Sequence, residues 1–265
     1  MRPIVALVTD FGNAGAYVPQ IKGAILSIDS DTRILDLSHT IKTHNIFETS
    51  YLVQKASSTL PANSIVCALI DPGVKSERPG IAIQTTSGKI YIGPDNGIFS
   101  HVLHKEGLTQ AVILDRPEFY YKNPPSPTFP GRDIFGPIAA HLASGTSLSE
   151  IGTPVGKLMR IDLKAPTKLG NKITGKIVHV DHLGNMITNI HRTHLPEQFE
   201  DKLVKVIFHR RTLTLPLVNT YAAAPKKRLF ALVNSDQELE VAIRDSSAAK
   251  KLKPRIGESI IFILK

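Results

Sequence analysis

The sequence predicts two successive domains of different class: an N-terminal α/β domain with a largely parallel sheet, and a C-terminal all-β domain that resembles a barrel. Up to about residue 160, short apolar runs rich in β-branched residues alternate with helical patterns, as in layered α/β folds. The pattern breaks in a stretch rich in Lys, Pro and Gly over 163–175. After it, strand-like runs follow one another closely with no long helical pattern, which is typical of a compact barrel or sandwich. We therefore expect domains at 1–165 and 172–265.

The N-terminal half contains apolar runs of strand length separated by segments with a periodicity near 3.6 residues. Helical segments between strands favour crossover connections and therefore parallel pairing. The predicted strands are 5–10, 32–38, 64–70, 80–85, 89–93 and 111–115, and the predicted helices are 17–28, 45–60 and 131–145.

In the C-terminal half, the runs are short and rich in Val, Ile, Leu and Phe, and the spacing between them leaves room only for turns and loops. The predicted strands are 176–180, 185–190, 202–208, 212–218, 228–233, 239–243 and 259–264.

Bulk composition excludes some classes of protein. The apolar runs are far shorter than the ~20 residues that span a bilayer, and the apolar stretch at the N-terminus is too short for a secretory signal, so we expect a cytoplasmic protein without membrane contact. The single cysteine, Cys67, lies in an apolar run and is expected to be structural. Of the net charge of +9, +7 lies after residue 170 (16 Lys and Arg, 9 Asp and Glu). These basic residues are scattered with few aromatics among them, so nucleic-acid binding is not expected.

Two predicted strands end at an acidic residue that is followed by a turn. Asp10 follows VALVT, and Asp71 follows SIVCALI. Ligands of α/β sheets bind at the carboxyl ends of strands, because the loops there converge over a crevice. We therefore expect Asp10 and Asp71 to face a small polar molecule, and a ribose diol is one group that a strand-end Asp can hold. The alternative for Asp10 is capping of the following turn.

Further polar segments carry other candidates. Arg78 follows Asp71 by seven residues, and an Asp–Arg pair would keep the carboxylate ionised and oriented, either to position water or to stabilise the loop. Asn96, in PDNG, is expected in a tight turn. The segment 131–133 (GRD) opens a predicted helix whose free N–H groups favour a polar ligand, and capping by Asp133 is an equal alternative.

In the second domain, the segment DHLGNMITN ends one predicted strand and begins another. The carboxylate of Asp181 could hold an ammonium group, and Asn185 could read a purine edge with its paired donor and acceptor. A β-turn with a satisfied Asn is the alternative. Histidine pairs at i, i+3 spacing (101/104 and 191/194) have no acidic or Cys partner nearby in the sequence, so no metal site is expected.

Taken together and in this order, these segments resemble the SAM hydroxide adenosyltransferase family, which includes SAM hydrolases and is related to the SAM-dependent fluorinase and chlorinase. The resemblance covers nearly the whole chain, through TDFG, YVPQIKGAI, DLSHTI, DPGV with a later Arg, GPDNG, TFPGRDIFGPIAA, DHLGNMITNI and NSDQELEVAI. It implies an N-terminal α/β domain and a C-terminal β-barrel. It also implies a homotrimer, or a dimer of trimers, with SAM bound between the N-domain of one subunit and the C-domain of its neighbour.

The resemblance also implies roles for individual residues. Asp71 and Arg78 would orient and activate the nucleophile. Leu183 stands where relatives commonly have an aromatic residue, so adenine stacking would be looser here. The implied substrate-binding residues are Asp10 for the ribose hydroxyls with Phe11 beside it, Asp181 for the methionine ammonium, Leu183 and Asn185 for adenine, and Ser235 for the methionine carboxylate.

The implied reaction transfers the 5′-deoxyadenosyl group of SAM to water-derived hydroxide, giving adenosine and L-methionine, with no metal or organic cofactor. In the hydrolases a His precedes the GRDIF segment, and here that residue is Pro130, which can neither accept a proton nor donate a side-chain hydrogen bond. His44 or His182 are candidates to replace it. The alternatives are a catalytically weakened SAM- or adenosine-binding protein and a halogenase. Asp71 argues against the halogenase, because halogenating relatives have Tyr there.

Overall fold

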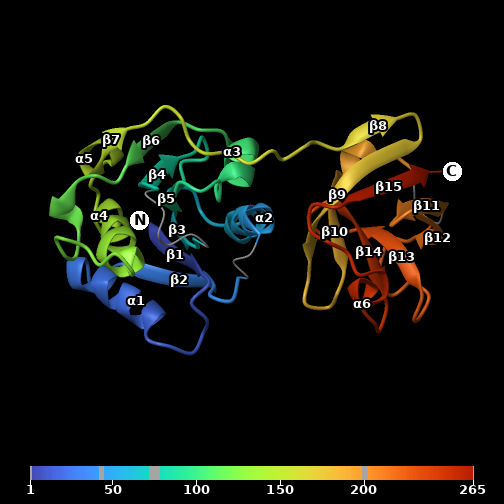
Figure 1. Cartoon of the computed structure of the whole chain (residues 1–265), viewed down its shortest axis with the longest axis horizontal. Helices are drawn as coiled ribbons and strands as arrows, with labels where there is room; N and C mark the ends of the chain where they lie inside the picture. Colours follow the sequence, from blue (N-terminus) through green and yellow to red (C-terminus); the bar gives the residue numbers. More distant parts are fainter. Residues whose placement is uncertain (1, 42–44, 72–77, 199–201, 265) are drawn as a thin grey trace. The chain divides into compact units, whose positions relative to one another are not determined.

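The computed structural model describes residues 2–41, 45–71, 78–198 and 202–264. The chain divides into two compact units, Met1–Asp162 and Leu163–Lys265, which appear in Figure 1 in blue to yellow-green and in yellow to red. The first unit contains strands and helices, and the second is built almost entirely of strands. An α/β unit followed by an all-β barrel was predicted, and this division by class is confirmed.

The first unit is a seven-stranded sheet in the order β2-β1-β3-β5-β4-β6-β7. All six predicted strands and all three predicted helices are present. The third of these helices begins as a π-helical turn, Gly131–Phe135, that continues into α4. The strands are β1 (Ile4–Thr9), β2 (Arg33–Ser38), β3 (Ile65–Leu69), β4 (Gly80–Gln84), β5 (Ile90–Pro94), β6 (Gln110–Ile113) and β7 (Thr153–Pro154), and the helices are α1 (Tyr17–Ile28), α2 (Ile46–Ser57), α3 (Ser100–Glu106), α4 (Gly136–Ala143) and α5 (Leu148–Ile151).

The prediction of a largely parallel sheet was wrong, because the sheet is mixed. Strands β2, β1, β3 and β5 are parallel to one another, whereas β4, β6 and β7 pair antiparallel. The reason is the connection between β4 and β5, which is only the turn at 85–89, closed by hydrogen bonds between the main chains of Thr85 and Lys89 and of Gly88 and Thr85. A parallel pair needs a crossover of a dozen or more residues, so a turn this short forces a hairpin.

Helices cover both faces of this sheet (Figure 1). Successive residues of β1 point to opposite faces: Val5 and Leu7 pack with α1 and α4, and Ala6 and Val8 pack with α2 and α3. Strands buried on both sides read as continuous apolar runs, which is why β1 and β3 were recognisable in the sequence. The parallel strands therefore bring their carboxyl ends to one edge of a rigid layer.

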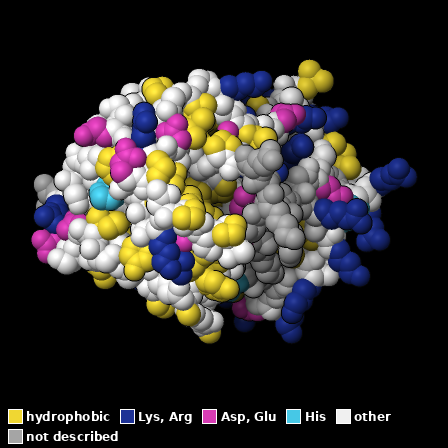
Figure 2. Space-filling model, turned by 60° about the vertical axis from the view of Figure 1, so that its left-hand side comes forward, with side chains coloured by type: hydrophobic (Ala, Val, Ile, Leu, Met, Phe, Trp, Pro, Cys, Tyr) yellow, Lys and Arg dark blue, Asp and Glu magenta, His cyan; other side chains and the backbone are white. Residues whose placement is uncertain are grey.

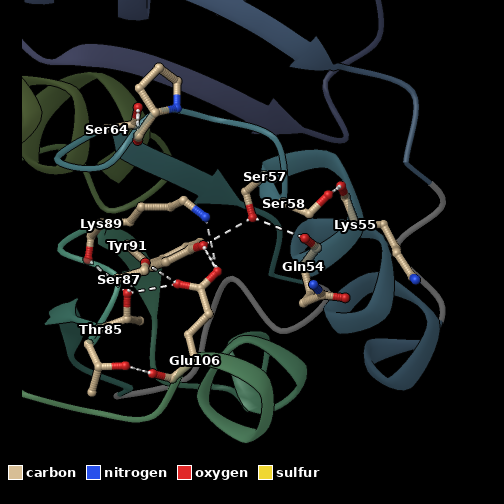
Figure 3. Close-up of polar contacts among 12 residues, drawn as sticks. Gln54, Lys55, Ser57, Ser58, Ser64, Thr85, Ser87, Lys89, Tyr91 and Glu106 are labelled. Atoms are coloured by element: carbon tan, nitrogen blue, oxygen red, sulfur yellow. Dashed lines mark hydrogen bonds and ion pairs between the residues drawn. The ribbon is translucent and has the colours of Figure 1, made fainter. Parts of the chain in front are cut away.

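A buried polar network fixes the N-terminal end of β5, away from the carboxyl edge of the sheet (Figure 3). Glu106, at the end of α3, accepts hydrogen bonds from Lys89 Nζ at 3.1 Å, Tyr91 OH at 3.1 Å and Ser87 Oγ at 2.6 Å. The Lys89 and Glu106 side chains are only 7% and 10% exposed. A buried ion pair is tolerated when further hydrogen bonds satisfy it, and here it ties α3 to the start of the strand whose other end, Pro94, reaches the candidate site.

The second unit is a closed barrel of seven strands. The order is β10-β14-β13-β12-β11-β15-β9, and pairing of β9 with β10 closes the ring, while β8 extends it at β9. Alternation along β11 shows the principle: Val204, Val206 and Phe208 fill the interior, and Lys205 faces outward. The strands are β8 (Thr167–Leu169), β9 (Lys172–Val180), β10 (Met186–His191), β11 (Lys202–Phe208), β12 (Arg211–Leu217), β13 (Leu229–Val233), β14 (Glu238–Ile243) and β15 (Ser259–Leu264), with the short helix α6 (Ala248–Leu252).

Charged and apolar side chains both occur on the surface. Lys and Arg side chains project from the face drawn in Figure 2, and apolar side chains are scattered over it. In the described part of the chain, no helix is both long and apolar enough to cross a membrane.

Candidate active site

The strand-end residues of the first unit line one cavity of about 190 Å³. Asp10 follows β1 and Asp71 lies just beyond β3, and both reach the cavity together with Arg78 and Pro130. Parallel strands end at the same edge of the sheet, so residues far apart in the sequence converge there. The remaining wall is mostly apolar, formed by side chains that include Phe11, Leu114, Phe129, Ile134 and Phe135.

Asp71 and Arg78 form the predicted ion pair. Arg78 Nη1 donates to Asp71 Oδ1 at 3.5 Å, and the two side chains, Asp71 and Arg78, are 21% and 39% exposed respectively. The contact holds a carboxylate and a guanidinium at the mouth of the same cavity. Gly80, two residues after Arg78, allows the Phe135 ring to pack against the main chain at the cavity wall, because a Cβ at this position would lie 2.7 Å from Phe135 Cε1.

Asp10 has an unusual environment for a carboxylate. Burial raises its pKa, and the nearby charge of Asp71 acts in the same direction. Two acidic groups in one largely apolar cavity favour a ligand that offers hydroxyl donors or positive charge to them. A ribose diol and a sulfonium group both meet that description.

The loop that carries Asp10 is held by a residue that the strand-end argument did not identify. Thr9 Oγ1 lies 2.9 Å from His39 Nδ1, and the Phe11 N–H donates to the same Thr9 oxygen. The Gly12 N–H donates to the His39 carbonyl at 2.7 Å. His39 Nε2 in turn lies 3.1 Å from Asp36 Oδ1. This chain of contacts ties the end of β1 to the end of β2 and fixes the direction of Asp10.

Pro130 also lines the cavity, on a segment that is anchored by a buried carboxylate. Asp133 is fully buried and receives two hydrogen bonds from Arg132, at 2.6 and 3.0 Å, and one from the Ser126 N–H at 2.8 Å. The bidentate geometry holds the pKa of Asp133 below its usual range. Asp133 is therefore engaged within the protein, and it fixes the proline-rich loop that presents Pro130 to the cavity.

Two other sequence candidates are not placed in this cavity. Asn96 is buried in its turn, where its Nδ2 donates to the Ile70 carbonyl at 3.0 Å and its Oδ1 accepts from the Ile98 N–H at 3.1 Å. It lies outside the lining of the cavity and stabilises the end of β3. His44 lies outside the described residues.

Three of the candidates in the second unit line a separate, open pocket of about 750 Å³, whereas Asp181 and Ser235 are not among its lining residues. His182, Leu183 and Asn185 line it, and Leu183 is 59% exposed. The turn is tight because Gly184 has a φ of 85° and packs against Ser247: a Cβ there would lie 1.9 Å from Ser247 Oγ. Only glycine fits this position.

Asp181 and Asn185 contact each other directly. The Asn185 N–H donates to Asp181 Oδ1 at 2.8 Å, and Asn185 Nδ2 donates to Asp181 Oδ2 at 2.9 Å and to Tyr221 OH at 3.3 Å. The amide donors of Asn185 are thus engaged, which leaves its Oδ1 to accept from a ligand. Ser235 lies in the turn between β13 and β14. Tyr221 and the buried Glu240, which contacts it, were not identified from the sequence.

Comparisons with known proteins agree on one family. The model of the SAM hydroxide adenosyltransferase N-terminal domain matches residues 5–152, and that of the C-terminal domain matches residues 175–261. An (R)-S-adenosyl-L-methionine hydrolase of Methanocaldococcus jannaschii is 33% identical, with 94% of this chain and 91% of that protein covered. A fluorinase of Nocardia brasiliensis is 27% identical, with 98% and 96% covered.

Solved structures show the same architecture. An uncharacterized conserved protein from Thermotoga maritima superimposes with a TM-score of 0.93 at 27% identity, covering 98% of this chain and 100% of that one. A conserved hypothetical protein from Thermus thermophilus gives a TM-score of 0.79 at 30% identity, covering 99% and 100%. With both family domains matched in order, the chain belongs to the SAM hydroxide adenosyltransferase family.

Proposed function

We propose that this protein is an enzyme that hydrolyses S-adenosyl-L-methionine to adenosine and L-methionine. The observation that carries the proposal is the cavity that brings together Asp10, Asp71 and Arg78 at the carboxyl edge of the sheet. Relatives named (R)-S-adenosyl-L-methionine hydrolase, at 28–33% identity over most of the chain, support the same reaction.

In this reaction a water oxygen attacks C5′ of the ribose in line with the C5′–S bond. The O–C5′ bond forms as the C5′–S bond breaks, the electron pair of that bond stays on sulfur as the neutral thioether of methionine, and the water proton is lost. The leaving group is already good, so the protein must position and desolvate the nucleophile. Asp71 accepts a hydrogen bond from the water, and Arg78 fixes the direction of that carboxylate. Asp10 holds the ribose hydroxyls.

Recognition of the two ends of SAM is assigned to the barrel unit. The free Oδ1 of Asn185 accepts from the adenine amino group, with Leu183 against the ring, and Asp181 receives the methionine ammonium. Ser235 binds the methionine carboxylate. The family resemblance supports a cytoplasmic homotrimer, or a dimer of trimers, in which these groups serve the cavity of a neighbouring subunit.

Because residue 130 is a proline, slow turnover of SAM is expected. Water has a pKa of about 15.7, so a positioned base matters, and the proline ring supplies none. Asp71 is then the remaining proton acceptor in the cavity. His182 lines the pocket of the barrel unit, so on the arrangement proposed above it would approach the cavity only from a neighbouring subunit. A catalytically weakened SAM- or adenosine-binding protein is the second candidate, and Pro130 is the observation that favours it.

Asp71 also distinguishes hydrolysis from halogenation. A halide needs a dry pocket without a nearby anion, and an ionised Asp71 in this cavity repels chloride or fluoride. Fluorinase relatives exist at 27–29% identity, so the distinction rests on the residues of the site.

A chromatographic assay tests the proposal. Purified protein is incubated with SAM, with and without fluoride, chloride or bromide, and nucleoside products are quantified together with methionine. Equal amounts of adenosine and methionine, abolished in Asp71→Ala, are expected. A 5′-halo-adenosine would assign the protein to the halogenases. No product, with SAM or adenosine raising the Tm, would assign it to the binding proteins.

A further inference from the structure

A buried carboxyl group in the barrel unit has no role in the reaction described above. Glu240 lies on β14 between Leu239 and Val241, and its residue is only 3% exposed. Burial raises its pKa. Within the described ranges no Lys, Arg or His forms an ion pair with it; its partners are Tyr221 OH at Oε1 and Asn234 Nδ2 at Oε2. A buried polar group costs stability unless it is hydrogen-bonded. An apolar residue at this position would fill the same space without needing such partners.

The first partner, Tyr221, connects Glu240 to Asn185, the residue proposed to bind adenine. The Tyr221 hydroxyl donates its proton to Glu240, so its lone pairs face Asn185 Nδ2, which donates to it at 3.3 Å. Asn185 Nδ2 also donates to Asp181. With both amide hydrogens engaged, the side chain of Asn185 is fixed with Oδ1 presented as an acceptor. Without Glu240, the Tyr221 proton would have no fixed direction, and Asn185 would be held by Asp181 alone.

The second partner, Asn234, connects Glu240 to the turn that carries Ser235. Asn234 Nδ2 donates to Glu240 Oε2 at 3.3 Å, while its Oδ1 accepts from the N–H groups of Asp236 and Glu238, at 3.0 Å each. The amide of Asn234 therefore frames the turn from inside. Its orientation is also fixed, because turning the amide over would set its NH₂ group against two N–H donors.

We propose that Glu240 is a positioning residue for substrate: a double acceptor that fixes Asn185 through Tyr221 and the Ser235 turn through Asn234. The inference rests on the proposed function, since it concerns recognition of the adenine and amino-acid ends of SAM. Both partners present donors, so a carboxyl group suits the position better than an amide. A Gln at 240 can accept from Asn234 with its oxygen, but its NH₂ group then donates to the Tyr221 hydroxyl, whose own proton loses its acceptor.

The role of Glu240 is tested by measuring the steady-state kinetics of SAM hydrolysis and the Tm of three proteins: wild type, Glu240→Met and Glu240→Gln. Because a lost hydrogen bond is worth about a factor of ten, Glu240→Met is expected to raise KM about tenfold. Its kcat should stay within about twofold, since the lost contact stabilises the bound substrate and the transition state equally. Glu240→Gln should fall between Glu240→Met and wild type. Glu197→Gln, the same chemical change at an exposed position of the barrel unit, should alter neither constant.

Tyr221→Phe is the second variant, which removes one hydroxyl and covers the case that Glu240→Met does not fold. It should raise KM, and combined with Glu240→Gln its effect should be less than additive, because both changes break one contact. If the wild type is active and the Glu240 variants have an unchanged KM, the inference is overturned but the proposed function is not. If the wild type does not turn SAM over, the proposed function fails, and the same series is measured by calorimetry as adenosine binding. A Kd unaffected by Tyr221→Phe, or no adenosine binding at all, then overturns the inference too.

Discussion

Pro130→His would place an imidazole in the cavity that already holds Asp71 and Arg78. The backbone permits the change: Pro130 has φ −63° and ψ −22°, a right-handed helical conformation open to any L-residue. The anchoring of Asp133 holds the loop in place, so the new side chain would enter a pre-formed site. We expect faster hydrolysis of SAM, because the imidazole adds a second group that can accept the proton of the attacking water.

The magnitude follows from what the cavity already contains. A positioned base contributes about 10²–10⁴-fold, and Asp71 already supplies part of this, so we expect kcat to rise about 10²-fold. Replacing proline enlarges the unfolded ensemble and costs about 0.4–1 kcal/mol. For a unit of this size that lowers the Tm by about 1–4 °C.

Adenosine release by chromatography under saturating SAM measures the rate, and Pro130→Ala is the matched control for loss of the ring. The control should lower the Tm equally and leave kcat near the wild-type value. If Pro130→His is no faster than Pro130→Ala, while both fold and bind SAM, the reasoning that a missing base limits this site is refuted.

Three further predictions concern the scaffold of the first unit, and urea unfolding measures each. Asp133→Asn should destabilise by about 2–3 kcal/mol at pH 7, since hydrogen bonds to a charged carboxylate are weakened; because Arg132 lowers the pKa of Asp133, this difference should shrink below pH 4, and a constant difference would contradict it. Burial lowers the pKa of His101 to about 4, so the unfolded chain, with a pKa of about 6.5, takes up protons first. Wild-type stability should therefore fall from pH 6.5 to 4, less so in His101→Gln. Gly93→Ala should cost about 1–3 kcal/mol, because the new Cβ would lie 2.5 Å from the Ala68 carbonyl oxygen; unchanged stability would show that β3 and β5 can separate.

The sequence predicted those parts of the site whose signal is local. Asp10 and Asp71 each follow an apolar run directly, and a buried strand with a polar residue at its end is visible without the fold. The pairing of Arg78 with Asp71 was also predictable, because the two residues are only seven positions apart in the sequence. The mixed sheet was also within reach, because the short connection between β4 and β5 allows only a hairpin.

Other features depend on tertiary contacts with no local signal. His39 reaches Thr9 across 30 residues of chain, and Tyr221 reaches Glu240 across 19 residues. A glutamate within the apolar run LEVAI looks like an exposed strand position, and only its contacts with Tyr221 and Asn234 show why it is buried. Such residues support the groups that touch a ligand, and their role follows from packing.

The most direct test of the central claim is the source of the oxygen in the product. SAM is incubated with the protein in water enriched in oxygen-18, and the adenosine formed is analysed by mass spectrometry. Attack of water at C5′ predicts one labelled oxygen, located at the 5′-hydroxyl, with unlabelled methionine. Adenosine without the label, or a 5′-halo-adenosine in its place when halide is present, would contradict the account.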